Sequence, residues 1–348
     1  MSVLVTGGAG YIGGHMVLAL LDAGESVVVL DDLSTGFRWA VPQAATLIVG
    51  DFGDAALLDR IIGERQIDAI AHFAAKIVVP ASVADPLAYY LNNTAKARTL
   101  LEWAVREKVK HFIFSSTAAV YGEPEANPVF ETTPLTPINP YGRSKLMVEW
   151  MLEDVARVHD LMFLILRYFN VAGADPKGRL GQSTPNATHL IKVAVQTALG
   201  QRKGLEVFGA DYPTRDGSCI RDYIHVTDLV QAHLLALDYL RGGGESLICN
   251  CGYGRGISVF EVIDAVKQVS GVDFDVRISS PRAGDPAALV AGADRIKAKL
   301  GWRPQHDNLA EIVRQALDWE RRLHNRTIDL LSDSKDLYRA NAPSVKPP

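Results

Sequence analysis

The 348-residue sequence contains little cysteine and no recognisable pattern of metal ligands. Its three cysteines, Cys219, Cys249 and Cys251, cannot all pair, and the last two are too close in an apparent strand for an easy bridge. The nine histidines are scattered, without a His-Glu-x-x-His motif or a Cys/His pair at metal spacing. We therefore expect no metal site and a reducing, cytoplasmic environment.

Long apolar runs and a strong charge of one sign are also missing. No apolar run approaches the ~20 residues of a membrane span, and the first predicted strand begins at once, without the basic region of a secretory signal. The net charge of −4 gives no reason to expect a nucleic acid or an anionic membrane as a partner. A hydrophobic content of 48% is sufficient for a proper core. These features predict a folded, soluble protein.

A glycine turn is the first feature that points to chemistry. The glycines of Gly7-x-x-Gly10-x-x-Gly13 lie between a short apolar run and a helical pattern over residues 12–23. Such glycines permit a tight turn and close backbone approach to phosphate, and a helix N-terminus attracts the anion. A second apolar run ends at Asp31, close to the spacing of a carboxylate that binds a ribose 2′-hydroxyl. The pattern favours NAD over NADP; a glycine turn that serves only the fold is the alternative.

Apolar strands alternate with helical patterns through the first half of the chain. We predict strands at residues 2–6, 26–31, 46–49, 69–72, 111–115 and 162–167, and helices at 55–65, 86–108 and 140–159. This rhythm indicates an α/β fold with a Rossmann-type, doubly wound parallel sheet. Beyond residue 167 the rhythm breaks, and helices return at 226–240, 259–270 and 309–323. We expect an NAD-binding domain over 1–167, a smaller α/β substrate-binding lobe mainly over 168–325 with some segments returning to the sheet, and a tail over 326–348.

Tyr141 and Lys145 lie four residues apart in the predicted helix 140–159, so their side chains share one face. A free phenol, with a pKa near ~10, is a poor base at neutral pH, and moving that pKa to about 7 takes roughly 4 kcal/mol. One cation at about 5 Å in an effective dielectric of ~20 supplies on the order of 3 kcal/mol. Lys145, helped by a positive nicotinamide, is thus expected to lower the pKa of Tyr141. Taken alone, the pair could also be an exposed amphipathic pair.

Several motifs carry a resemblance to a known family. The glycine turn from Thr6 to Gly13, Tyr141-x-x-x-Lys145 and the Ser-Ser-Thr-Ala-Ala-Val-Tyr-Gly run over 115–122 resemble the extended short-chain dehydrogenase/reductases. Residues 167–170, 211–214 and 221–226 are similar to the UDP-sugar 4-epimerases of that family, and the likeness runs from residue 2 to about 323. It implies an isomerase of galactose metabolism, a homodimer that interconverts UDP-glucose and UDP-galactose through a transient 4-keto sugar. NAD would be regenerated in each turnover and act as a prosthetic group.

The resemblance also implies roles for individual residues. The catalytic residues would be Thr117, Tyr141 and Lys145. The NAD contacts would be Gly7, Gly10, Tyr11, Ile12, Gly13, Asp31, Ser34, Thr35, Asp51, Phe52, Phe73, Ala74, Ala75, Asn92, Tyr141, Lys145 and Tyr168. Substrate contacts would come from Thr117, Asn170, Leu190, Phe208, Arg221, Arg282, Asp285 and Leu289, with the two arginines on the diphosphate. Lys76 is displaced by one position from the family pattern, and a solvated surface lysine is an equal alternative.

Other activities of the same fold stay open to different degrees. A nucleotide-sugar dehydratase places an acidic pair directly after the strand-end Thr, where this chain has Ala118 and Ala119. A non-catalytic NAD sensor would not need Thr117, Tyr141 and Lys145 together. A 4-epimerase for UDP-N-acetylhexosamines or UDP-pentoses is a closer alternative. Leu289 falls where hexose-restricted members carry Tyr, so we expect a permissive sugar pocket.

Overall fold

A seven-stranded sheet forms the centre of the larger part of the protein. The structure, a computed structural model, describes residues 1–64, 66–282 and 285–340. The strand order is β10-β6-β5-β4-β1-β2-β3, and all neighbouring strands are parallel. The sheet-forming segments are β1 (Ser2–Thr6), β2 (Ser26–Asp31), β3 (Thr46–Val49), β4 (Ile67–His72), β5 (His111–Thr117), β6 (Met162–Tyr168) and β10 (Leu247–Cys251).

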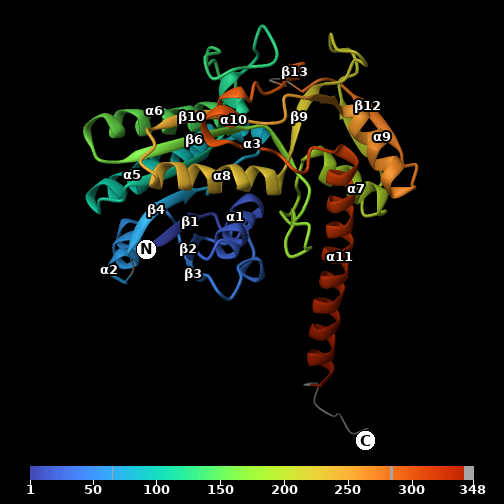
Figure 1. Cartoon of the computed structure of the whole chain (residues 1–348). Helices are drawn as coiled ribbons and strands as arrows, with labels where there is room; N and C mark the ends of the chain where they lie inside the picture. The colour runs from blue at the N-terminus through green and yellow to red at the C-terminus, as the bar shows by residue number, and fades with distance from the viewer. Residues whose placement is uncertain (65, 283–284, 341–348) are drawn as a thin grey trace, which may run out of the picture.

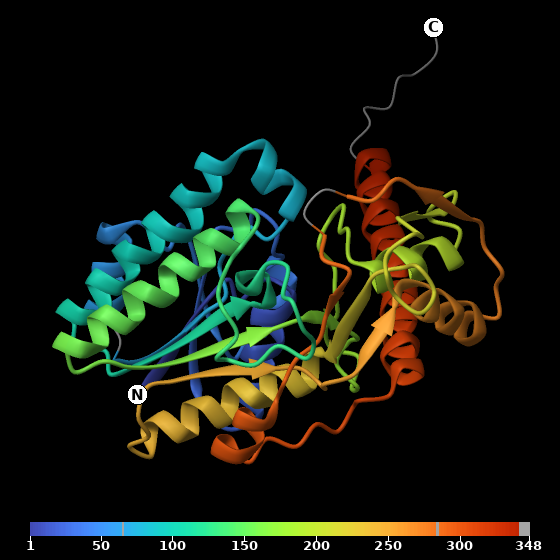
Figure 2. The same ribbon diagram turned by 90° about the horizontal axis from the view of Figure 1, so that it is seen from above.

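Helices cover both faces of this sheet (Figures 1 and 2). One apolar core joins the sheet to α1 (Tyr11–Asp22), α8 (Val226–Arg241) and α10 (Asp294–Leu300). A second core joins the other face to α2 (Ala55–Glu64), α5 (Lys96–Arg106) and α6 (Pro140–Val158). The strand order reverses between β1 and β4, and in such sheets ligands bind beyond the carboxyl ends of the strands at this point. The predicted Rossmann-type fold is confirmed, and β10 is a segment that returns to the sheet.

The predicted helix over 86–108 is less regular than expected. It consists of α4 (Pro86–Tyr89), the π-helical segment η2 (Tyr90–Ala95) and α5, and it follows the short helix α3 (Val79–Ala84), which we did not predict. The short 3-10 turns η1 (Arg38–Ala40) and η3 (Ala118–Tyr121) follow β2 and β5. π-Helical turns occur frequently at functional sites, and η2 contains Asn92.

The remaining elements form the smaller lobe. A small sheet contains β7 (Asn170–Ala172), β9 (Ile220–His225), β11 (Gly256–Ser258) and β13 (Ala288–Leu289), and β8 (Leu205–Phe208) pairs with β12 (Val276–Ser279). A third apolar core joins these strands, except β13, to α7 (Leu190–Ala198), α9 (Val259–Ser270) and α11 (Leu309–Ala340). Figure 2 shows this lobe beside the sheet domain, with α11 running past α7 and α9.

Helix α11 is longer than the sequence suggested. We expected it to end near Leu323 and to be followed by an irregular tail, but it continues to Ala340 and projects away from the body of the protein (Figure 1). The rest of the predicted tail, residues 341–348, lies outside the described residues, as does Arg65 at the predicted end of α2. Among the described helices, none combines the length and the apolarity needed to cross a bilayer.

Candidate active site

A cleft of about 1030 Å³ lies at the carboxyl ends of the central strands and is bounded on its other side by the smaller lobe. Most of the residues that we predicted from the sequence line it, although they come from segments far apart in the chain. These residues are Gly7, Gly10, Tyr11, Ile12, Gly13, Asp31, Ser34, Thr35, Phe52, Phe73, Ala74, Ala75, Asn92, Thr117, Tyr141, Tyr168, Asn170, Arg221, Asp285 and Leu289.

Five predicted residues are not among the described residues that line the cleft. Asp51 instead forms an ion pair with Lys96, whose ammonium group lies 2.6 Å from the Asp51 carboxylate. Lys145 is buried behind the lining, and Leu190 lines a small separate cavity. The guanidinium of Arg282 stacks on the ring of Phe208, 3.5 Å from its centroid.

The glycine turn has the shape of a phosphate cradle. A Cβ on Gly13 would lie 2.2 Å from the carbonyl oxygen of Gly7, and a Cβ on Gly7 would lie 2.7 Å from the nitrogen of Ala74. Helix α1 begins after Gly10 without a side-chain cap, so its first N–H groups are available where Tyr11, Ile12 and Gly13 line the cleft. A pyrophosphate fits these free donors and the positive end of the helix dipole.

Asp31 ends β2 beside this cradle and is mostly buried. Its two carboxylate oxygens accept hydrogen bonds from the backbone nitrogens of Ala9 (2.9 Å) and Leu33 (2.8 Å). Burial raises the pKa of this carboxyl, and the two backbone donors oppose that shift. Each carboxylate oxygen retains a further lone pair, so Asp31 can accept hydrogen bonds from the hydroxyls of a ribose.

Asn93 holds the cofactor-facing loop after β4, a role that our sequence analysis missed. Its side-chain oxygen accepts from the nitrogen of Lys76 (2.8 Å), and its amide nitrogen donates to the carbonyl of Lys76 (2.9 Å) and to the hydroxyl of Ser144 (3.0 Å). The π-helical turn thereby ties this loop to α6, which carries Tyr141. The Lys76 side chain is exposed and lines the cleft, so both readings of this residue remain compatible with its position.

Thr117, Tyr141 and Lys145 meet where β5 ends and α6 begins. The side chain of Asn139 caps α6 by accepting from the nitrogen of Gly142 (2.9 Å), which fixes the first turn of the helix and with it Tyr141. One turn later, the Lys145 ammonium donates to the carbonyl oxygen of Ser115 (2.8 Å). The alternative interpretation of Tyr141 and Lys145 as an exposed amphipathic pair is thereby excluded, since both side chains are buried.

The pKa values of this pair differ from our expectation. Burial raises the pKa of Tyr141 to about 12, and the hydrogen bond with Thr117 opposes the shift only in part. Burial likewise lowers the pKa of Lys145 to about 7, with the carboxylate of Glu149 opposing. The expected lowering of the Tyr141 pKa by Lys145 is therefore not found in the protein alone. Desolvation, which disfavours the charged form, is the largest cause of both shifts. Positive charge in the cleft would favour the phenolate.

The lobe contributes an arginine and a carboxylate to the opposite wall of the cleft. The guanidinium of Arg221, on β9, lies 3.9 Å from the carboxylate of Asp285, and both residues line the cleft together with Leu289. A cationic group that is only loosely paired is suited to an anionic ligand.

A loop over residues 184–188 also lines the cleft and was not predicted. Its sequence, Thr-Pro-Asn-Ala-Thr, has no hydrophobic period, so no sequence signal indicates that it reaches the site. Asn139 and Tyr89 line the cleft as well. The first could have been found from its position before a Pro at a helix start.

Comparisons with known proteins agree with this geometry. The model of the NAD dependent epimerase/dehydratase family matches residues 3–252. A UDP-glucose 4-epimerase of Azospirillum brasilense is 59% identical over 321 residues, which cover 92% of each chain. The crystal structure of a UDP-glucose 4-epimerase from Brucella ovis in complex with NAD has a TM-score of 0.88 and 43% identity, covering 91% of this chain and 97% of that chain. The UDP-Glc/GlcNAc 4-epimerase from Campylobacter jejuni has a TM-score of 0.81 and 48% identity, covering 92% of this chain and 99% of that chain. The family resemblance predicted from the motifs is confirmed, and the chain belongs to the NAD dependent epimerase/dehydratase family.

Proposed function

We propose that the protein is an NAD-dependent UDP-sugar 4-epimerase. The observation that carries this proposal is that one cleft contains the glycine turn, Thr117 and Tyr141, with Arg221 on the opposite wall. A dinucleotide sensor would need the glycine turn alone. The names of similar proteins, UDP-glucose 4-epimerases at up to 59% identity, support the same activity.

The chain's own residues would handle the proton while the cofactor handles hydride. Bound NAD supplies the acceptor and the donor of hydride for carbon 4 of the sugar. The Oη of Tyr141 takes the proton from the sugar 4-hydroxyl and returns it after the keto sugar has rotated to present its other face. The Thr117 hydroxyl holds the oxygen on carbon 4 of the sugar by a hydrogen bond. Burial raises the Tyr141 pKa to about 12 in the protein alone, and positive charge beside the phenol would favour the phenolate that acts as the base.

We propose the remaining roles from position. The glycine turn holds the pyrophosphate of NAD, Asp31 its ribose and Phe52 the adenine. Asp51 would act on the adenine site indirectly, through its ion pair with Lys96. On the substrate side, Arg221 binds the diphosphate and Asp285 the uridine ribose. Arg282, Phe208 and Leu190 are assigned to the nucleotide by the family resemblance, and they would contact it only at the edge of the cleft.

The dehydratase alternative lacks its chemical groups. Ala118 and Ala119 line the cleft directly after Thr117, and neither carries the acid or base that dehydration needs. No described feature of the cleft favours that reaction over epimerisation.

We further propose that the sugar pocket is permissive. Leu289 is buried in the cleft wall and packs in a small apolar cluster with Tyr121 and Phe169. An isobutyl group leaves more room near the sugar's second carbon than a phenol would. The similar protein from Campylobacter jejuni, a UDP-Glc/GlcNAc 4-epimerase, supports lesser activity on UDP-N-acetylglucosamine, and UDP-pentoses would also fit.

A homodimer is the proposed assembly. Val83, Leu87 and Leu91 follow one another at four-residue spacing along α3, α4 and η2, and their exposed fractions are 61%, 76% and 61%. Trp150 on the adjacent α6 is 52% exposed. A patch of this kind is typical of a protein–protein interface. We also place the protein in the cytoplasm, since Cys219, Cys249 and Cys251 are buried free thiols.

The test is to incubate the purified protein with UDP-glucose, UDP-galactose, UDP-N-acetylglucosamine and a UDP-pentose, without adding NAD, and to identify the products. We expect the 4-epimers to form, because NAD should remain bound through gel filtration and appear in the supernatant after denaturation. A protein that arrives empty and consumes NAD stoichiometrically would contradict the proposal and indicate a net dehydrogenase.

A further inference from the structure

The loop over residues 183–188, here called the cleft loop, is closed at its base by two side chains. The amide nitrogen of Gln182 lies 2.8 Å from Nδ1 of His189, so one hydrogen bond joins the two ends of the loop. Residues 184–188 line the cleft between these ends, and Gln182 and His189 line both the cleft and a small cavity behind it. The small cavity, of about 20 Å³, therefore lies directly against the base of the cleft loop.

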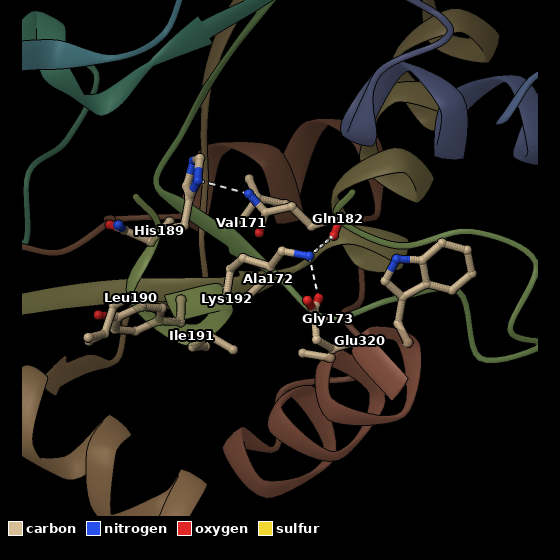
Figure 3. Close-up of a pocket in the computed structure, with 13 residues that line it drawn as sticks. Val171, Ala172, Gly173, Gln182, His189, Leu190, Ile191, Lys192 and Glu320 are labelled. Carbon is tan, nitrogen blue, oxygen red and sulfur yellow. Dashed lines mark hydrogen bonds and ion pairs between the residues drawn. The ribbon is translucent and has the colours of Figure 1, made fainter. Parts of the chain in front are cut away.

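A buried ion pair between Lys192 and Glu320 lines that small cavity. The Lys192 ammonium, on α7, donates to the carbonyl oxygen of Gln182 (2.6 Å) and also to the carboxylate of Glu320 on α11. Only 5% of the Lys192 side chain and 4% of the Glu320 side chain are exposed. Figure 3 shows the ammonium between the Gln182 carbonyl and the Glu320 carboxylate. The second carboxylate oxygen of Glu320 accepts from the amide of Gln196 (3.0 Å).

The neighbouring residue of α11 contacts the start of the same loop. The indole nitrogen of Trp319 donates to the hydroxyl of Ser183 (3.2 Å). Gly181 lies against the Trp319 ring so closely that a Cβ there would approach it to 2.3 Å. Trp319 thus contacts the first residue of the cleft loop directly, whereas its neighbour Glu320 acts on the base of the loop through Lys192.

Stability alone does not account for this arrangement. Replacing a buried ion pair by apolar side chains of similar size is often neutral or stabilising, because desolvation of the charges is costly. An apolar pair at these positions could not donate to the Gln182 carbonyl. What Lys192 adds to the other contacts is a direct hydrogen bond to the backbone at the base of the loop.

We propose that Lys192 and Glu320 are a positioning pair that holds the cleft loop closed over the nucleotide sugar. This inference rests on the proposed epimerase function, in which the oxidised 4-keto sugar must stay bound until hydride returns. If the loop opens in mid-cycle, the two-electron oxidation at carbon 4 is complete, the proton is on Tyr141, and the keto sugar leaves. The enzyme then retains reduced nicotinamide and is inactive.

The deciding experiment uses Lys192→Met with Glu320→Leu, an apolar replacement of the pair. We expect the melting temperature and the NAD content to stay near wild type and the KM for UDP-glucose to rise about tenfold, the usual loss for a hydrogen bond to a charged group. We expect kcat to change less than about threefold at first, with reduced-nicotinamide fluorescence accumulating several-fold faster during turnover. A merely structural pair would not alter that fluorescence.

Two further variants complete the design. Glu320→Gln keeps a hydrogen-bond acceptor for Lys192, so it is the conservative variant, and we expect a KM increase well below that of the apolar pair. Arg241→Met removes a half-buried pair with Glu25 and Asp68 away from the cleft, and we expect neither KM nor fluorescence to change.

Wild-type KM and wild-type fluorescence in the folded double variant would overturn the inference. If that variant does not fold, the deciding variant is Lys192→Met with Glu320→Gln, which removes the donor to the Gln182 carbonyl without leaving an unpaired buried charge; wild-type KM and fluorescence there would overturn the inference. Either outcome leaves the proposed function intact as long as the wild-type protein epimerises UDP-glucose. A wild-type protein without epimerase activity would instead contradict the proposed function, so the two failures are distinguishable.

Discussion

The ammonium of Lys145 donates to the main-chain carbonyl of Ser115 at 2.8 Å, and this hydrogen bond fixes the position of the positive charge nearest the proposed base. The Ser115 hydroxyl is in turn hydrogen-bonded to the phenol of Tyr168, and the same ammonium lies 4.8 Å from the centroid of the Phe114 ring. The ammonium of Lys145 is therefore held in a buried position beside the end of β5. Further positive charge in the cleft would favour the phenolate of Tyr141, whose pKa burial raises to about 12.

Replacing Tyr141 with Phe tests the proposed base directly. We expect kcat for UDP-glucose to fall by about 10²–10⁴-fold, because the proton-transfer group is lost, while the affinity for UDP stays within a few-fold of wild type. Steady-state kinetics and calorimetric titration with UDP measure the two quantities. Near-normal turnover in this variant would show that another group takes the proton.

The pH dependence of stability should report the lowered pKa of Lys145. Burial lowers this pKa to about 7 in the folded protein, whereas an unfolded lysine titrates near ~10.4. Between these values the unfolded state binds the proton and the folded state does not, so stability rises with pH; below about pH 7 both states are protonated and the penalty of burial is fully present.

We expect the NAD-free wild-type protein to gain about 1 kcal/mol per pH unit over Lys145→Met between about pH 7 and pH 10. Denaturant unfolding at several pH values measures the difference, and other titrating groups cancel because both proteins contain them. Parallel pH profiles for the two proteins would mean that Lys145 keeps an ordinary pKa. The Lys145→Met variant should also retain less NAD after gel filtration, since it lacks the ammonium group near the cofactor site.

The apolar patch on α4 and η2 allows a test of the proposed homodimer. We expect Leu87→Glu combined with Leu91→Glu to sediment as a monomer, because two buried carboxylates at an interface would lose their hydration without gaining partners. Val272→Glu is the matched control, since Val272 is 40% exposed on another part of the surface. If the control and the double variant sediment alike, the patch is not the interface.

Local patterns predicted the parts of the site that are built from neighbouring residues. The glycine turn and the Tyr141–Lys145 pair each depend on short spacings. The alternation of apolar runs predicted the central strands other than β10 to within two residues at each end. Asn93 could not be found in this way, because its partners Lys76 and Ser144 lie 17 and 51 positions away. Lys192 resembles an ordinary helix lysine until Glu320, 128 positions away, is seen beside it.

The raised pKa of Tyr141 could not be predicted from the sequence for a related reason. The sequence shows the lysine one turn away, but it does not show how completely both groups are removed from water, and desolvation is the largest cause of the shift of each. Likewise, Arg282 was a reasonable diphosphate ligand by its motif, while its stacking on Phe208 depends on the pairing of β8 with β12.

Leu289→Tyr tests the permissive sugar pocket. Leu289 is 7% exposed and lines the cleft near Asp285, so a phenol at this position would occupy space beside the sugar rather than extend into solvent. We expect turnover of UDP-N-acetylglucosamine to fall by more than about tenfold, because its acetamido group must share that space. UDP-glucose and UDP-galactose should lose less than about threefold, since their smaller hydroxyl at carbon 2 still fits and the reaction takes place at carbon 4. Leu289→Met, which conserves volume, is the control and should spare all three sugars. An equal loss for the N-acetylated and the plain hexoses, or wild-type protein without activity on the N-acetylated sugar, would refute the assignment of Leu289 as the residue that determines sugar range.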